Sequence, residues 1–462
     1  MRMVRTSLAS VLALSFCLAA CSKGSPGSAP PHEPADSAVA TRDVAEADAA
    51  APATTTTRSS WSVGGIVRGK TETIRTEPGS APPDTPPVEE PTPPPQPTVQ
   101  AGLLTAGDHD DLLNPELYAD YAGKFLQQHG GDLPFVDTRT RVAVKLVDAG
   151  GRPVPFARVA VARSGNPLQL VSGADGTVSI YPRFDHVPAR TTLAIVSAAG
   201  NVSRALDLGA HRVTVTLPGS APSVSALDLA LVVDTTGSMG DEMAYLQAEL
   251  DEIVARLKRE AGNVDLRIGL IVYRDTGDDY VVRATPLTSN IDGLRAVLAR
   301  QEAAGGGDTP EAVDQAVDAA ERLQWRPGAA KAMLLVADAP PHDEGIAPTL
   351  AGTERLRARG VQIVPVAASV VEESAEYVMR TMAALTQGRY IFLTDDSGVG
   401  NPHAEPDVSC YLVTRLDGLI ARVLAGIVQG RRIEPASGEV VRAVGDYDHG
   451  RCRRAGLASR QG

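Results

Sequence analysis

The residues best suited to chemistry form one short stretch that follows an apolar run. Residues 227–233 are mostly apolar, and Asp234, Thr236 and Ser238 come next at every second position. A buried strand that ends in a carboxylate and two spaced hydroxyls presents oxygen ligands from one tight loop, which is the arrangement that a hard divalent cation requires. The stretch therefore predicts metal-dependent binding.

An alternation of strands and helices must position this loop. Helical periodicity separates the apolar runs between residues 225 and 430, and residues 243–257 show one clear apolar stripe. This pattern indicates an α/β fold with a doubly wound, mainly parallel sheet, whose ligand site lies at the carboxyl ends of the strands. The expected strands are residues 227–233, 266–273, 332–337, 361–367 and 390–393.

The Asp234 loop is similar to the Asp-x-Ser-x-Ser signature of the von Willebrand factor A domain, a Rossmann-like fold with a metal-ion-dependent adhesion site. Two later segments resemble the family's other ligand loops, namely residues 305–312 and the strand end at Asp338. We assign residues 221–430 to this domain. The resemblance implies that Thr236 and Ser238 bind the ion through their hydroxyls, while Asp234 and Asp338 act mainly through water. It also implies a partner that supplies a carboxylate.

The second ligand loop offers two candidates, Thr309 and Glu311. Many relatives use one threonine there, whereas the order Asp-x-Pro-Glu is closer to the loop of integrin β subunits, in which the glutamate is a direct ligand. The resemblance leaves this choice open. A glutamate ligand would neutralise more of the ion's charge and weaken its affinity for an outside carboxylate. The implied cofactor is a divalent cation, with Mg²⁺ preferred over Mn²⁺ and Ca²⁺.

Two further acidic segments lie near the predicted site. Asp241 and Glu242 follow Ser238 at the spacing that integrin β domains use for a second ion, so they are candidates for a second metal site. The alternative is a favourable acidic first turn of a helix. Residues 273–279 recur in a bacterial and protist subgroup of the family, and we interpret their aspartates as a solvated loop.

The start of the chain predicts export. Two arginines precede a short apolar run at residues 8–18, as in a secretory signal. Residues 18–21, Leu-Ala-Ala-Cys, resemble the lipobox of bacterial lipoproteins, which implies a signal peptide of residues 1–20 and acylation of Cys21. The alternative is an ordinary secretory signal. We expect a lipid-anchored protein of the bacterial cell envelope. In a Gram-negative host, Ser22 after the cysteine would favour the outer membrane.

Residues 21–102 are rich in Pro, Ala, Thr and Ser and predict a disordered tether. An apolar island around Trp61 is either a docking peptide or, as we favour, an apolar patch within this linker. Two cysteines remain beyond the signal and the acylation site, Cys410 and Cys452. In an oxidising compartment they form either a disulfide or two unpaired thiols.

Residues 103–220 predict a short helix and a small β-sandwich. The helix is expected at residues 114–128, and short β-type runs follow at intervals of ten to fifteen residues. Residues 147–159 and 174–178 resemble the carboxypeptidase regulatory-like β-domain, which implies a spacer or a binding accessory, of which we favour the spacer. The last helix is expected near residues 411–428, and residues 431–462 predict a C-terminal extension with a frayed tail.

Two classes of function fit these patterns. The first is a membrane-tethered module that binds a protein or peptide carboxylate through the ion. The second is an enzyme, either a metal-assisted hydrolase or a regulatory subunit of an enzyme complex. We favour the first and assign no catalytic residue, because no nucleophile motif, zinc signature or phosphate loop is present and His342 fits a loop residue beside the site. The net charge of −12 provides no basic field for nucleic acid.

Overall fold

The computed structural model describes residues 102–453, except for residues 131–132, 308, 370, 400–401 and 407 and the side chain of Asp241. The predicted signal peptide, Cys21 and the linker with Trp61 lie outside this part of the chain. None of the described helices has the length and apolar character needed to cross a membrane.

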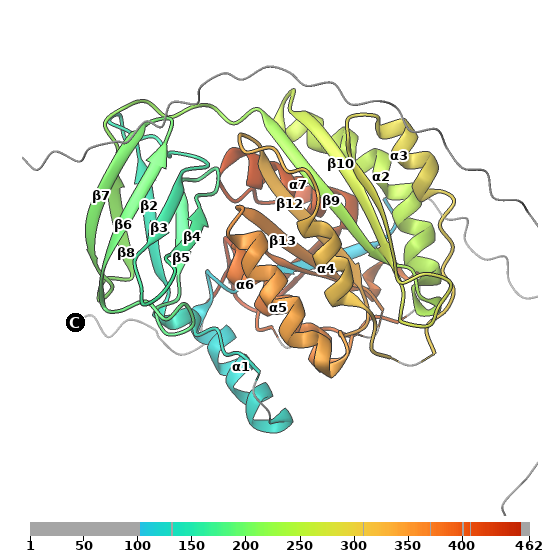
Figure 1. Ribbon diagram of the computed structural model, residues 1–462. Coiled ribbons are helices and arrows are strands. Elements are labelled where there is room, and N and C mark those ends of the chain that lie inside the picture. The colour runs from blue at the N-terminus through green and yellow to red at the C-terminus, as the bar shows by residue number, and fades with distance from the viewer. Residues whose placement is uncertain are drawn as a thin grey trace, which may run out of the picture. The chain divides into compact units, whose positions relative to one another are not determined.

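A nine-stranded sheet forms the centre of the fold (Figure 1), in the order β11-β10-β9-β12-β13-β14-β1-β15-β16. The neighbours β10, β9, β12, β13 and β14 run parallel, which confirms the predicted α/β fold with a mainly parallel sheet. The five expected strands are all present, within a few residues of the predicted ends. The sheet consists of β1 (Thr105–His109), β9 (Ala226–Asp234), β10 (Asp265–Tyr273), β11 (Val282–Thr288), β12 (Ala330–Ala337), β13 (Val361–Ala367), β14 (Tyr390–Thr394), β15 (Tyr411–Arg415) and β16 (Arg442–Val444).

Helices cover both faces of this sheet because its strands carry apolar side chains on both sides. Along β9, Leu229 and Leu231 pack into one core, and Ala230 and Val232 pack into the other. Figure 1 shows α4, α5 and α6 in front of the sheet. The first core contains α2 (Gly240–Ala261), α3 (Ile291–Leu298) and α7 (Leu416–Gln429), and the second contains α1 (Pro115–His129), α4 (Val313–Glu321), α5 (Asp343–Arg357) and α6 (Glu373–Thr386).

The sheet includes strands that precede and follow residues 221–430 in the chain, so the predicted boundaries of the A domain need correction. Strand β1 lies between β14 and β15 and pairs antiparallel with both, although it was assigned with the β-sandwich. Residues 411–415 form β15 rather than the first turn of the last helix. Strand β16 extends the sheet from within the predicted C-terminal extension. The mostly small and polar sequence of β1 lacks the apolar alternation that identifies a strand, and only its two partners make it one.

A seven-stranded β-sandwich follows α1, as the sequence predicted. Apolar side chains from both of its sheets fill a separate core. The sequence predicted five of the strands and missed β4 and β7. Most of the side chains of β7 are exposed, so it lacks the apolar alternation of a strand. One sheet contains β2 (Val142–Val147), β5 (Thr177–Ile180) and β8 (Arg212–Thr216), and the other contains β3 (Arg158–Val161), β4 (Leu168–Val171), β6 (Arg190–Ser197) and β7 (Gly200–Asp207).

Short elements complete the fold. A disulfide joins Cys410, next to β15, to Cys452 in the hairpin of β17 (Tyr447–Asp448) and β18 (Arg451–Cys452). This bond ties the segment after residue 430 to the sheet. Four 3₁₀ turns are η1 (Thr138–Thr140), η2 (Gly237–Met239), η3 (Asp395–Ser397) and η4 (Ser437–Glu439).

Candidate functional site

The candidate site lies at the carboxyl ends of the neighbouring parallel strands β9 and β12, where Asp234 is the last residue of β9 and Asp338 follows β12. The backbone N–H and the hydroxyl of Thr236 both donate to Oδ1 of Asp234, over 2.9 Å and 2.7 Å. The hydroxyl oxygens of Thr236 and Ser238 are 3.4 Å apart. The loop therefore gathers one buried carboxylate and two hydroxyls at a single point.

Glu311 joins this group from the loop before α4. Its side chain is buried, and its backbone N–H donates to the carbonyl of Pro340 over 2.9 Å. Gly306 lies between Glu311 and Thr236. A Cβ added to this glycine would be 3.0 Å from Glu311 Oε1 and 3.2 Å from Thr236 Cβ, so a larger residue would crowd both side chains. The φ of Gly306 is +66°, a conformation that favours glycine. Thr309, the other candidate ligand, is exposed, and Asp308 lies outside the described residues.

The electrostatics of the site are those of crowded carboxyl groups. Burial raises the pKa of Asp234 to about 7, and the neighbouring charge of Asp338 adds to this shift. Burial and the charge of Asp234 raise the pKa of Glu311 to about 9. One buried oxygen of Asp234 and one of Glu311 accept no hydrogen bond from any described residue. Carboxylates held this close cannot all be ionised without a compensating cation.

This donor set fits a hard divalent cation better than a soft one. It offers carboxylate and hydroxyl oxygens, the ligands that Mg²⁺ and Ca²⁺ prefer. In the described part of the chain, no three His, Cys, Asp or Glu side chains are arranged so that they alone could hold a metal ion. The hydroxyls of Thr236 and Ser238, together with water, would therefore have to complete any coordination here.

The segment 273–279 contributes to the site, so its interpretation as a solvated loop holds for the exposed Asp279 but is wrong for the buried Asp275. The guanidinium of Arg274 is buried and donates to the carbonyl of Thr235 over 3.1 Å. Oδ2 of Asp278 accepts from the backbone N–H of Gly306 over 2.9 Å. These two side chains fix the loops that carry Thr236 and Gly306. The sequence signal that could have shown this is the run of three glycines at residues 305–307, which lets the backbone approach closely.

His342 lies beside the site in the loop that precedes α5. Its Nε2 is 2.7 Å from Oδ1 of Asp275, which is itself mostly buried. The pair links the loop after β12 to the loop after β10. This contact gives His342 a role in holding two site loops together.

The candidate second metal site has a different environment from the first. Oε1 of Glu242 accepts from the backbone N–H of Ser369 over 3.0 Å and also from its hydroxyl. Glu242 thus ties the start of α2 to the loop after β13. The side chain of Asp241 lies outside the described residues, so the second metal site stays a prediction.

The comparison with protein families agrees with this geometry. Residues 228–402 match the model of the von Willebrand factor type A domain. They form a von Willebrand factor type A domain. The A domain begins within β9, and β1, β15 and β16 complete its sheet from outside the matched residues. A domain of this family supports a role in binding other proteins.

Curated relatives match the chain over part of their length. An ariadne-like RING finger protein of Acanthamoeba polyphaga mimivirus is 30% identical over 187 residues, which are 37% of this chain and 18% of that protein. The alpha-protein kinase vwkA of Dictyostelium discoideum is 30% identical over 119 residues, which are 25% of this chain and 19% of the kinase. The chain thus spans less than a fifth of the length of either relative.

Solved structures also resemble part of this chain. BatB from Bacteroides thetaiotaomicron is 16% identical, with a TM-score of 0.29, and the match covers 38% of this chain and 91% of BatB. The pilus adhesin SpaC of Lactobacillus rhamnosus GG, in its open conformation, is 11% identical, with a TM-score of 0.33. That match covers 65% of this chain and 36% of the adhesin.

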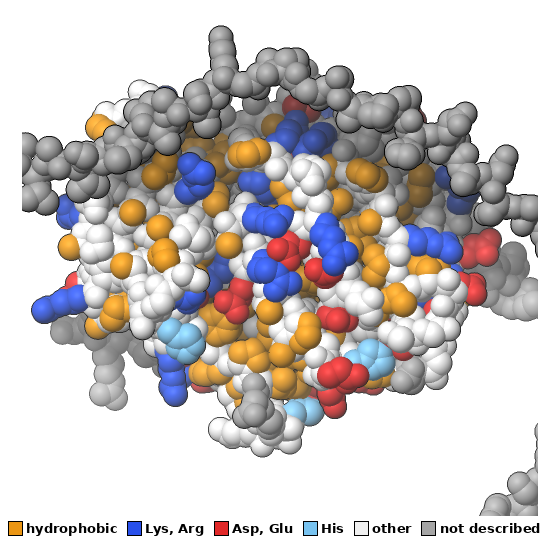
Figure 2. All heavy atoms as spheres, in the orientation of Figure 1, with side chains coloured by type: hydrophobic (Ala, Val, Ile, Leu, Met, Phe, Trp, Pro, Cys, Tyr) orange, Lys and Arg blue, Asp and Glu red, His pale blue; other side chains and the backbone are white. Residues whose placement is uncertain are grey.

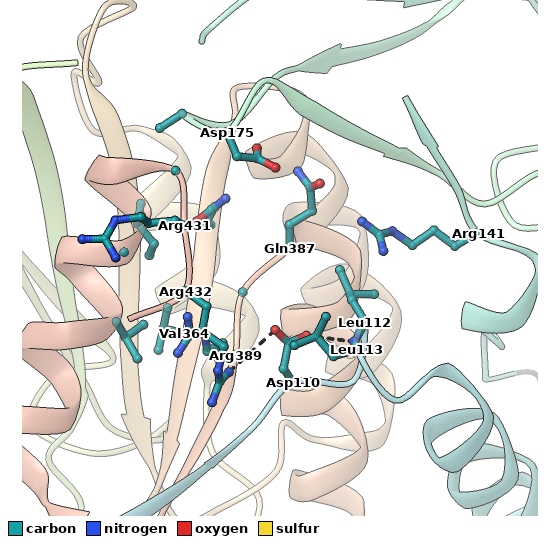
Figure 3. A pocket seen from close by; sticks show the side chains of 17 residues that line it. Asp110, Leu112, Leu113, Arg141, Asp175, Val364, Gln387, Arg389, Arg431 and Arg432 are labelled. Atoms are coloured by element: carbon teal, nitrogen blue, oxygen red, sulfur yellow. Dashed lines mark hydrogen bonds and ion pairs between the residues drawn. The ribbon is translucent and has the colours of Figure 1, made fainter. Parts of the chain in front are cut away.

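A separate pocket of about 230 Å³ lies near the amino ends of β13 and β14. Figure 3 shows that Arg389, Arg432 and Asp110 line it, with Arg141 and Asp175 of the β-sandwich. Arg432 and Arg389 pair with Asp108 of β1 over 3.0 Å and 3.5 Å. Burial alone would raise the pKa of Asp108, but these two arginines hold it below its ordinary value. Both arginines are thus engaged in holding β1 in place.

Proposed function

We propose that this chain is an extracytoplasmic, metal-dependent module for adhesion or scaffolding, which binds a carboxylate-bearing protein or peptide at the Asp234 site. The proposal rests on three buried acidic residues, Asp234, Glu311 and Asp338, which lie beside two hydroxyl groups. One carboxylate oxygen of Asp234 and one of Glu311 accept no hydrogen bond from a described residue. A divalent cation, Mg²⁺ in preference to Mn²⁺ or Ca²⁺, would compensate these charges.

The residues of the site would have different roles in binding the cation. Thr236, Ser238 and Glu311 would hold the cation directly, while Asp234 fixes the hydroxyl of Thr236 through the 2.7 Å hydrogen bond. Asp338 would act as an outer acceptor at the end of the neighbouring strand. The bound cation would supply a Lewis-acidic centre for an acidic side chain of the partner. Since Ser238 is exposed, this side of the site is open to such a partner.

We further propose that the chain is anchored in the bacterial cell envelope through acylated Cys21, with the outer membrane as its location. The support is the resemblance of residues 18–21 to a lipobox. Metabolic labelling with a palmitate analogue tests the anchor. Label that disappears in the Cys21→Ser variant would support it, and unlabelled wild-type protein in a bacterial host would refute it.

The decisive experiment for the site is a calorimetric titration of Mg²⁺ and Mn²⁺ into the full chain. The full chain is needed because β1, β15 and β16 complete the sheet. We expect saturable binding that Asp234→Ala abolishes. Asp292→Ala, which removes an exposed carboxylate on α3, is the matched control and should bind as the wild type does. If the wild type binds neither ion, the metal-dependent mechanism is wrong.

The alternative is a metal-assisted hydrolase or a regulatory subunit of an enzyme complex. The match to a protein kinase raises this alternative, although it covers only 19% of that kinase. We propose that the chain itself is not an enzyme, since the sequence places no nucleophile motif near His342. We expect no turnover of generic ester, phosphoester or peptide substrates with Mg²⁺. Turnover that Asp234→Ala abolishes would instead favour the hydrolase.

A further inference from the structure

A second pocket, of about 770 Å³, lies where the β-sandwich meets the ends of α4 and α5. Phe156 and Arg158 line it from the sandwich, Trp325 lines it from the segment after α4, and Lys331 lines it from the start of β12. We call this cavity the Lys331 pocket. Its size suits a small organic molecule. It lies at the amino ends of the strands, at the opposite edge of the sheet from the Asp234 site.

Lys331 is a buried cation that forms no ion pair with any carboxylate of the described residues, although Asp228 lies near enough to act on its charge. Only 5% of its surface is exposed. Its register neighbour on β9 is Asp228, but the oxygens of Asp228 accept hydrogen bonds from Arg267 and Arg326. No ion pair joins Lys331 to a carboxylate within the described part of the chain. A buried ammonium group without a partner is costly, and an anionic ligand would remove this cost.

Two aromatic side chains line the same pocket. The Nζ of Lys331 is 5.5 Å from the centre of the Phe156 ring, within reach of a cation–π interaction. Phe156 has a φ of +56°, which is strained for a bulky residue. The indole N–H of Trp325 donates to the carbonyl of Ala320 over 3.0 Å, so the ring is fixed against the end of α4. The pocket thus combines flat apolar surfaces with a buried positive charge.

The remaining charges leave the pocket with an excess of positive charge. Arg322 is paired with Asp318, and Arg359 is paired with Glu321. Arg158 is exposed and forms no ion pair with a described residue, so it adds to the charge of Lys331. Figure 2 shows basic and acidic side chains interspersed near the centre of the face that it draws.

We propose that the Lys331 pocket binds a small aromatic carboxylate, which pairs with the ammonium group of Lys331 and packs against Phe156 and Trp325. This site is separate from the Asp234 site and needs no metal ion. The two proposals can therefore fail independently.

The test is a titration of phenylacetate into the full chain, in the presence of EDTA and at pH 7. Trp325 is one of two tryptophans, so its fluorescence can be followed alone in a Trp61→Phe background. We expect a saturable change, at least tenfold weaker binding in Lys331→Met, and at least tenfold weaker binding of the neutral phenylacetamide. Lys258→Met, on the surface of α2, is the control and should bind phenylacetate as the background protein does.

A second variant keeps the test valid if Lys331→Met misfolds. Phe156→Leu preserves an apolar side chain but removes the ring, and it should weaken binding at least threefold. Absence of saturable phenylacetate binding would overturn the proposal. Equal affinities for the acid and the amide, or wild-type affinity in a folded Lys331→Met variant, would also overturn it.

The pH dependence provides an independent readout. Burial lowers the pKa of Lys331 to about 8. The charged groups around it are Asp228 on β9, Arg158 of the sandwich and, at the ends of α4 and α5, the ion pairs Asp318–Arg322 and Glu321–Arg359. Since the ammonium form binds the ligand, affinity should fall about tenfold between pH 7 and pH 9. An affinity that is unchanged over this interval would exclude Lys331 as the binding group.

Discussion

At the scale of single residues, the site depends on acidic groups that raise one another's pKa. The pKa values of Asp234 and Glu311 are raised to about 7 and about 9, first because both carboxyl groups are buried. Gly306 makes this crowding possible, since any Cβ there would press against Glu311 and Thr236. The same crowding that destabilises the ionised protein would provide affinity for a cation.

The choice between Thr309 and Glu311 leads to the first prediction. Glu311 is buried beside Asp234, whereas Thr309 is exposed. Glu311→Gln should therefore weaken Mg²⁺ binding by at least about tenfold, a typical loss for a group that supports a metal. Thr309→Ala should change the affinity less than threefold. Calorimetry measures the Mg²⁺ affinity of both variants. A larger loss of affinity in Thr309→Ala than in Glu311→Gln would assign the ligand to Thr309.

The raised pKa values lead to a prediction about the metal-free protein. The ordinary pKa values are 3.8 for Asp234 and 4.5 for Glu311, so both groups bind protons more tightly in the folded state. Their contribution to stability is complete below about pH 4 and is lost as the pH rises through about 7 and about 9. In EDTA, the melting temperature should fall by at least about 3 °C between pH 5 and pH 9.

Glu311→Gln is the control for this pH dependence, because the amide does not titrate. Its melting temperature should decline less over the same interval, and added Mg²⁺ should reduce the decline in the wild type. If the variant and the wild type have the same slope, Glu311 does not titrate as described.

At the scale of elements, β1 is inserted between two strands that come much later in the chain. Its Gly107 lies opposite Phe392 of β14 and Val413 of β15. Close packing explains the glycine, since a Cβ at this position would lie 2.6 Å from Phe392 Cζ and 2.9 Å from Tyr411 Cδ2. The strand therefore depends on the absence of a side chain at its centre.

This packing predicts that Gly107→Ala destabilises the protein by about 1–3 kcal/mol, the usual cost of overpacking a core. Gly123→Ala is the matched control, because nothing lies within 4 Å of a Cβ added there on α1. The control should be neutral or should stabilise the protein by up to about 1 kcal/mol, as alanine favours a helix. Urea denaturation of both variants measures the difference, and a neutral Gly107→Ala would mean that β1 is loosely packed.

At the scale of the whole molecule, a buried ion pair joins the β-sandwich to the A domain. Arg357 of α5 donates to both carboxylate oxygens of Asp185, over 2.6 Å and 2.9 Å. It also donates to the carbonyl of Ser179 over 2.7 Å. Nearby, the hydroxyl of Tyr181 donates to the carbonyl of Ala384 in α6. These contacts pack the sandwich against the A domain.

Breaking this pair should destabilise the protein strongly, because Arg357→Met leaves the carboxylate of Asp185 buried without its cation. We expect a loss of about 3–5 kcal/mol. Arg359→Met, which removes a half-exposed arginine that pairs with Glu321, should cost less than about 1 kcal/mol. Thermal unfolding followed by circular dichroism tests both variants. Similar small effects of the two substitutions would mean that the domains do not depend on this pair.

The sequence by itself determined the parallel strands, the helices between them and the position of Asp234 at a strand end. Local apolar periodicity carries this information, because a strand buried on both faces must be continuously apolar. Only the tertiary structure decided which side chains meet. It buried Glu311, brought Asp278 to Gly306 and inserted β1 between β14 and β15. These contacts join residues far apart in the chain, and a polar residue's burial depends on those distant partners rather than on its neighbours in sequence.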